Sequence, residues 1–195
     1  LIEAGYPYFM LDTSYRMHPT LLQVPNSLFY DNCIQCGYVG DREKTFLYSN
    51  KPFLFVDVRN GEEKLKGTSF FNQEEAVATR ALVDMCINQF QEQNRNSEEI
   101  PGFPCVRMTK RDIYVVTPYN AQKQVIADKL EALDMQEQVI SIDSSQGREF
   151  DIVFVSMVRT SPGDFIKEFN RINVAITRAK HGLVIFGNAK NLSRD

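Results

Sequence analysis

Residues 112–158 read DIYVVTPYNAQKQVIADKLEALDMQEQVISIDSSQGREFDIVFVSMV, and apolar runs alternate there with one amphipathic segment. Residues 112–117, 138–142 and 152–158 are short runs rich in β-branched side chains, so they are predicted strands, and 121–133 is a predicted helix. Because these strands are apolar on both faces, they fit a parallel sheet that is covered on both sides. The stretch therefore predicts an α/β layer fold.

The same alternation continues on either side of this stretch. The predicted helices are 19–30, 73–90 and 172–179, and the predicted strands are 53–58 and 183–186. Strand 53–58 is predicted to be buried. Asn72 is a predicted N-cap with Glu75 in the capping-box position. The helix that follows repeats apolar residues at helical spacing, namely Ala76, Val77, Ala81, Leu82, Met85 and Phe90.

Two stretches, 59–71 and 91–110, are predicted loops because they combine glycine, proline and polar residues. Residues 1–195 are therefore expected to form a single domain in which 91–110 is one long irregular segment. In a parallel sheet, ligands bind at the carboxyl ends of the strands. That rule directs attention to the loops after Val116, Ile142 and Val158, and to the segment before Leu183.

Composition restricts the possible functions. The net charge is −3 and the pI is near 5.5, so any nucleic-acid contact is expected to be local rather than a bulk electrostatic effect. The start carries no signal peptide, and no apolar run reaches the ~20 residues that span a membrane. Cys33 and Cys36 form a CxxC without a second pair, so free thiols are expected in place of a metal site. A first residue Leu1 suggests a segment of a longer protein.

Arg16 stands in the block Tyr15-Arg-Met-His-Pro19, directly before a helix that opens with proline. A guanidinium there can bind a phosphate in bidentate geometry. The same residue also fits an arginine that caps a loop or pairs with a carboxylate.

The block Thr117-Pro-Tyr-Asn-Ala-Gln122 joins a strand to a helix. Backbone N–H groups in such a turn suit a phosphate, and Tyr119 can stack on a base. The alternative is an ordinary helix start in which Thr117 is the N-cap and Pro118 the first helical residue.

The polar segment 141–151 lies between two apolar strands. Gly147 permits a close approach of the backbone to a ligand, and Gln146 and Glu149 offer an amide and a carboxylate for ribose hydroxyls or a water. A plain crossover loop is the alternative.

In the last block, 170–181, Arg171 and Arg178 are seven residues apart and are predicted to share a helical face that meets a triphosphate. Asn173, Thr177 and Lys180 are predicted to share another face. A solvated basic face near a helix C-terminus is the alternative.

Together and in order, SYRMHP, VVTPYNAQ, SIDSSQGREFDIVFVSMVRT and RINVAITRAKHGLVIFGN resemble the C-terminal helicase domain of superfamily one. The branch typified by the nonsense-mediated-decay RNA helicases is the most similar, and the resemblance covers roughly residues 11–190. It implies a RecA-like parallel sheet with helices on both faces. Cys33 and Cys36 do not belong to the family pattern.

The resemblance also implies roles for single residues. Arg16 and Arg178 would be arginine fingers on the γ-phosphate of ATP. Glu149 and Gly147 would hold the ribose, and Tyr15 would lie near the base or sugar. The residues expected to lie toward the nucleic-acid strand are Thr117, Tyr119 and Ser141.

The chain contains no GxxxxGK[ST] phosphate loop, and no Asp-Glu pair for Mg²⁺ precedes the first block. In the resembling family these parts belong to a first RecA-like domain. ATP and Mg²⁺ are therefore expected to be held mainly by that domain of the same protein. The resemblance also implies a protein inside the cell, in the cytoplasm rather than in the nucleus. The expected ligand is single-stranded RNA or DNA, and the isolated segment is expected to be inactive. Two other hypotheses remain: a nucleic-acid clamp or scaffold with vestigial ATPase activity, and a nucleotide-binding domain unrelated to helicases.

Overall fold

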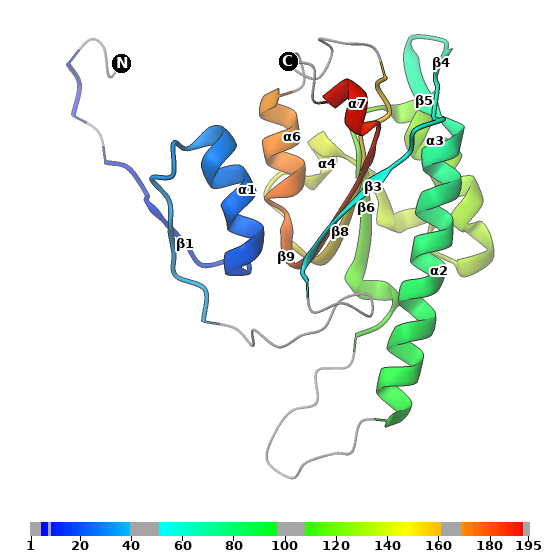
Figure 1. Ribbon diagram of the computed structural model, residues 1–195, viewed down its shortest axis with the longest axis horizontal. Coiled ribbons are helices and arrows are strands. Elements are labelled where there is room, and N and C mark those ends of the chain that lie inside the picture. The colour runs from blue at the N-terminus through cyan, green and yellow to red at the C-terminus, as the bar shows by residue number, and fades with distance from the viewer. Residues whose placement is uncertain (1–4, 8, 40–50, 97–107, 161–168, 193–195) are drawn as a thin grey trace.

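A computed structural model describes residues 5–7, 9–39, 51–96, 108–160 and 169–192. Its centre is a parallel sheet in the order β3-β9-β8-β6-β7 (Figure 1). These strands are β3 (Phe53–Asp57), β6 (Ile113–Thr117), β7 (Val139–Ser141), β8 (Phe150–Ser156) and β9 (Ala179–Gly187). The predicted α/β fold with a parallel sheet is confirmed.

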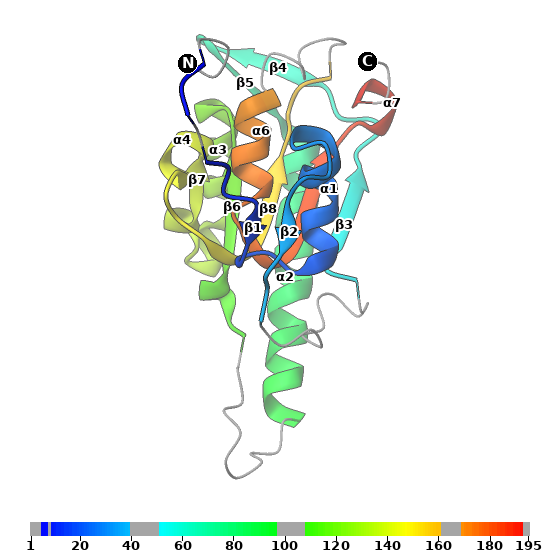
Figure 2. The same cartoon turned by 90° about the vertical axis from the view of Figure 1, so that its left-hand side faces the viewer.

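Helices cover both faces of the sheet: they lie on its two sides in Figure 1, and Figure 2 looks onto one of the covered faces. One face carries α1 (Pro19–Phe29), α4 (Ile142–Ser145) and α6 (Phe169–Ile176), and the other carries α2 (Gln73–Asn96) and α3 (Asn120–Leu130). Successive strand residues point to opposite faces, so Val153 and Val155 pack with α1 and α6 while Ile152 and Phe154 pack with α2 and α3. Two separate cores result, one on each face.

The order of the crossovers fixes the point in the sheet at which the strand order reverses. The chain leaves β6 through α3 on one face, and it leaves β8 through α6 on the other face. Because β6 and β8 are neighbours, their carboxyl ends form a topological switch point, where open α/β sheets bind ligands.

Residues 59–71 are not a simple loop, contrary to the sequence prediction. They contain the antiparallel hairpin β4 (Glu63–Lys66) and β5 (Ser69–Asn72). A second small sheet pairs β1 (Thr13–Ser14) with β2 (Gln35–Cys36). Three 3-10 turns at 110–112, 131–133 and 136–138 and the short helix α7 (Ala189–Leu192) complete the described elements.

Helix α2 extends to Asn96, so the first six residues of the predicted loop 91–110 are helical, and 97–107 lie outside the described residues. Asn72 caps this helix, because its Oδ1 accepts a hydrogen bond from the Glu75 backbone N–H at 3.0 Å. The Glu75 side chain does not complete the capping box: it contacts β8 instead.

The apolar pattern of α2 contains two stripes, and only one of them is buried. Ala76, Val83, Cys86 and Phe90 face the sheet, whereas Val77 and Met85 are 52% and 49% exposed. The apolar spacing therefore predicted the helix, but not all of its apolar residues are buried. Strand β3 is also half-exposed rather than buried, because it lies at the edge of the sheet. No helix among the described residues is long and apolar enough to cross a membrane.

Candidate functional site

The residues singled out by sequence lie at opposite edges of the sheet. Glu149 and Arg178 come directly before β8 and β9, at the amino edge, whereas Thr117 and Ser141 end β6 and β7 at the carboxyl edge. The seven residues of β8 separate the two edges by about 20 Å. The rule that ligands bind at carboxyl ends therefore finds only one of the two groups.

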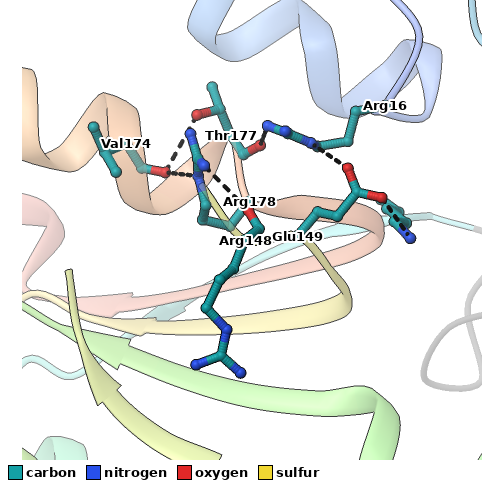
Figure 3. A network of polar contacts seen from close by, with 7 residues as sticks. Arg16, Arg148, Glu149, Val174, Thr177 and Arg178 are labelled. Atoms are coloured by element: carbon teal, nitrogen blue, oxygen red, sulfur yellow. Dashed lines mark hydrogen bonds and ion pairs between the residues drawn. The ribbon is translucent and has the colours of Figure 1, made fainter. Parts of the chain in front are cut away.

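At the amino edge, Arg16 joins three segments of the chain (Figure 3). Its Nε donates to Glu149 Oε2 at 3.0 Å, and its Nη1 donates to the Thr177 carbonyl at 3.0 Å. Two residues later the His18 N–H donates to the Lys180 carbonyl at 2.8 Å, which fastens the segment before α1 to β9. These contacts place the Arg16 guanidinium beside the turn between α6 and β9.

Arg178 lies in that same turn, because α6 ends at Ile176. Its Nε donates to the Val174 carbonyl at 2.9 Å and its Nη1 to the Arg148 carbonyl at 3.1 Å (Figure 3). For both Arg16 and Arg178, the Nη2 atom makes no hydrogen bond to any described residue. Each guanidinium is thus oriented by two contacts and retains donors for an anion.

The charges in this cluster are unbalanced. Glu149 pairs with Lys180 at 2.9 Å and with Arg16 at 3.0 Å, and both cations hold the pKa of its carboxyl below the usual value. Burial lowers the pKa of Arg178, and the charge of Arg16 lowers it further, so the two guanidinium groups interact. Because arginine stays charged at neutral pH, three cations surround one carboxylate and the site favours an anion.

A cavity of about 250 Å³ opens beside the cluster. Arg16, Thr177 and Arg178 line one part of it, and residues of the β1 segment, of α1 and of the segment after α1 line the rest. Tyr15 is 72% exposed and lies against Gly37, where an added Cβ would come within 2.5 Å of the ring. Gln146 and Gly147 are exposed on the loop toward Glu149, with Gly147 at φ +74°.

Arg171 does not join this cluster, contrary to the prediction that it shares a face with Arg178. Its Nη2 donates to Asp143 Oδ2 at 3.0 Å and to the Pro118 carbonyl at 3.3 Å. The seven-residue spacing fails because α6 ends between the two arginines. For the same reason Thr177 and Lys180 lie past the helix, and not on one helical face with Asn173.

The carboxyl edge gathers Thr117, Tyr119 and Ser141. Thr117 is fully buried, and its hydroxyl has no hydrogen-bond partner among the described residues. The alternative in which Thr117 is the N-cap of α3 is wrong, because Tyr119 is the N-cap and makes no side-chain capping bond. Ser141 caps α4 by accepting a hydrogen bond from the Ser144 N–H at 3.1 Å. Tyr119 and Ser141 are therefore the partly exposed side chains of this group.

A buried polar network underlies the carboxyl edge at the switch point. The Gln122 side chain donates to Ser156 Oγ at 2.9 Å, and Ser156 donates to Glu75 Oε2 at 2.6 Å. The Val158 N–H donates to both Glu75 oxygens, at 3.0 and 3.2 Å. Val158 has φ +71°, which a β-branched residue rarely adopts, so this network holds a strained turn directly after β8.

Two members of the amino-edge cluster were missed as site residues by the sequence. Lys180 was assigned to a helical face, although it lies in β9 and binds Glu149. The Arg148 guanidinium lies 5.3 Å from the Tyr114 ring and 5.0 Å from the Phe150 ring, which stack on each other at 3.9 Å. This stack holds the backbone whose carbonyl accepts from Arg178; its only sequence signal was the position of Arg148 beside Gly147 and Glu149.

A family model described as an AAA domain, AAA_12, matches residues 1–190 of the chain. The chain belongs to this family. This AAA domain is 34% identical over 211 residues to "Regulator of nonsense transcripts 1" of Caenorhabditis elegans. The match covers 100% of the chain and 18% of that relative.

Two further relatives are similar over the whole AAA domain. It is 32% identical to "Regulator of nonsense transcripts 1 homolog" of Arabidopsis thaliana, of which it covers 16%. It is also 32% identical to "ATP-dependent helicase upf1" of Schizosaccharomyces pombe, of which it covers 21%. The resemblance to the nonsense-mediated-decay branch of the superfamily-one helicases is confirmed, and the chain spans about a fifth of these relatives' length.

Proposed function

We propose that this AAA domain is the second motor domain of an ATP-dependent helicase and that Arg16 and Arg178 act on the γ-phosphate of ATP. The observation that carries the proposal is the amino-edge cluster, where two guanidinium groups are held close together with donors to spare. Two like charges are unfavourable when they are close, unless an anion binds between them. The γ-phosphate in its transition state is such an anion.

The nucleotide itself would be held mainly by another RecA-like domain of the same protein, with Mg²⁺, because this chain contains no phosphate loop. Bound ATP supplies the phosphoryl group that is transferred to water. The chain's own contribution is to position Arg16 through Glu149 and the Thr177 carbonyl, and Arg178 through the Val174 and Arg148 carbonyls. Glu149 is half-exposed, so it has room for a ribose hydroxyl as well as for its two cations.

Single-stranded RNA, or DNA as the second choice, would bind at the carboxyl edge, near Tyr119 and Ser141. A nucleotide between two motor domains would close them, and its hydrolysis would relax them while each domain keeps its own grip on the strand. The two edges are therefore assigned different ligands: nucleotide at the amino edge and strand at the carboxyl edge.

The test is steady-state ATPase activity of the full-length protein without strand, with single-stranded RNA and with single-stranded DNA. Arg178→Ala is expected to lower the strand-stimulated kcat by about a thousandfold or more, as for other arginine fingers. Arg111→Ala is the matched control, because Arg111 is exposed and lies outside the cluster. Strand binding by Arg178→Ala is expected to change little.

Equal kcat values for Arg178→Ala and the wild type would refute the role of Arg178. A wild type that binds strand but hydrolyses no ATP under any condition would favour the clamp or scaffold instead. The ratio of kcat/KM between RNA and DNA identifies the preferred strand.

A further inference from the structure

The β4–β5 hairpin lies beyond the carboxyl ends of the sheet strands, as both views show (Figure 1, Figure 2). Its loop is two residues long, and the first of them, Gly67, has φ +63°. Glycine at that position is typical of a type II′ turn, which matches the twist of its strands. The hairpin is therefore a short, regular ribbon at the edge assigned above to nucleic acid.

Contacts with two other segments, the one after β8 and the one at the start of α3, hold the hairpin in place. Arg159 Nε lies 2.8 Å from Glu63 Oε2, and its guanidinium lies 4.0 Å from the centre of the Phe70 ring. The Phe70 ring meets Tyr119 edge-to-face at 5.7 Å. Ser69 Oγ accepts a hydrogen bond from the Ala121 N–H at the start of α3. The ribbon is thus docked directly on the residues before α3.

These contacts use mainly β5, which leaves β4 as the outer strand. Lys64, Leu65 and Lys66 are exposed, and Leu65 is 64% accessible. Because side chains alternate along a strand, Lys64 and Lys66 project from the same face, with Phe71 opposite Lys64 in register. Neither lysine forms an ion pair within the described part of the chain.

Two uncompensated cations on one face of a rigid ribbon contrast with a chain whose net charge is −3. The nearby Arg159 cannot serve the same purpose, because Glu63 already neutralises it. A local pair of this kind is what a protein of low overall charge needs to bind a polyanion. The Cα atoms of Lys64 and Lys66 are about 7 Å apart, so their ammonium groups can reach two successive phosphates.

We propose that the β4–β5 hairpin extends the strand-binding surface and that Lys64 and Lys66 contact the phosphates of single-stranded nucleic acid. The inference rests on the proposed function, because it needs a strand at the carboxyl edge. The hairpin lies outside the four sequence blocks that resemble the superfamily-one helicase domain.

The test is the salt dependence of strand binding by the full-length protein, measured by fluorescence anisotropy with a labelled single-stranded RNA. Each phosphate contact contributes about 0.7 to the slope of log Ka against log salt concentration for a single strand. Lys64→Ala with Lys66→Ala is therefore expected to lower the slope by about 1.4 and to weaken binding about 25-fold at about 0.1 M salt. Lys64→Arg with Lys66→Arg keeps both charges and is expected to retain the slope.

The matched control is Lys51→Ala with Arg111→Ala. Both residues are exposed and lie before β3 and β6 at the amino edge. Their replacement removes two positive charges, as in the Lys64/Lys66 double variant. Equal slopes for the wild type and the Lys64/Lys66 double variant would overturn the hairpin contact while leaving the motor function intact. Equal losses in both double variants would also overturn it. A wild type that binds no strand would overturn the proposed function together with this inference.

Discussion

Glu75 offers a quantitative test of the buried network, because its carboxyl is fully buried and no cation among the described residues contacts it. Burial raises its pKa from 4.5 to about 7, against the hydrogen bonds from Ser156 and Val158, which favour the charged form. Folding at pH 6 therefore takes up a proton at Glu75. The substitution Glu75→Gln removes the titration while preserving the shape of the side chain.

The sign of the effect follows from the raised pKa. Between pH 4.5 and 7 the folded chain binds more protons than the unfolded chain, so the free energy of unfolding falls as pH rises. A rise from 4.5 to about 7 corresponds to roughly 3 kcal/mol, at about 1.4 kcal/mol per pH unit. This stability is fully present below pH 4.5 and is lost as pH rises through 7.

The assay is urea unfolding of residues 1–195 at a series of pH values, for the wild type and Glu75→Gln. The difference in unfolding free energy, wild type minus variant, is expected to fall by about 3 kcal/mol, most of it between pH 4.5 and 7. A difference that is flat, or that rises with pH, would show that Glu75 is already ionised at pH 5. Its hydrogen bonds would then outweigh the effect of burial on its pKa.

Two further predictions concern residues outside this network. Burial raises the pKa of the Cys86 thiol to about 12. At pH 8, N-ethylmaleimide is therefore expected to modify the exposed Cys33, whereas Cys86 reacts only after unfolding. Mass spectrometry checks this, and labelling of Cys86 in the folded protein would contradict it. Arg148→Ala removes the stack that holds the carbonyl facing Arg178, and is expected to lower the full-length protein's kcat by at most about fivefold, the worth of a cation–π contact of about 1 kcal/mol. A loss as large as that of Arg178→Ala would assign Arg148 a direct role.

The parallel sheet was predictable because its strands are defined by local apolar runs. The predicted strands 112–117, 138–142 and 152–158 all appear, with boundaries shifted by one or two residues. The β4–β5 hairpin was not predictable in this way. Its first strand is mostly charged, and the hairpin is held by contacts with Arg159 and the start of α3, which are distant in sequence.

The candidate site was predictable in its residue types but not in its arrangement. Arg16 and Arg178 line the same cavity, whereas Arg171 pairs with Asp143, because α6 ends between Arg171 and Arg178. Boundaries of helices depend on tertiary contacts and are the least certain feature of a sequence pattern. The division of the site between two edges of the sheet follows from strand direction, which no single motif encodes.

Nucleotide affinity is the sharpest test of whether Arg178 acts on the transferring phosphoryl group. The measurement compares ADP with ADP–fluoroaluminate, a mimic of the transition state, on the full-length wild type and Arg178→Ala. A finger that acts only in the transition state predicts an unchanged Kd for ADP and a Kd for the mimic that rises on the order of a hundredfold or more. Equal losses of affinity for both nucleotides, or no loss for the mimic, would show that Arg178 is not such a finger.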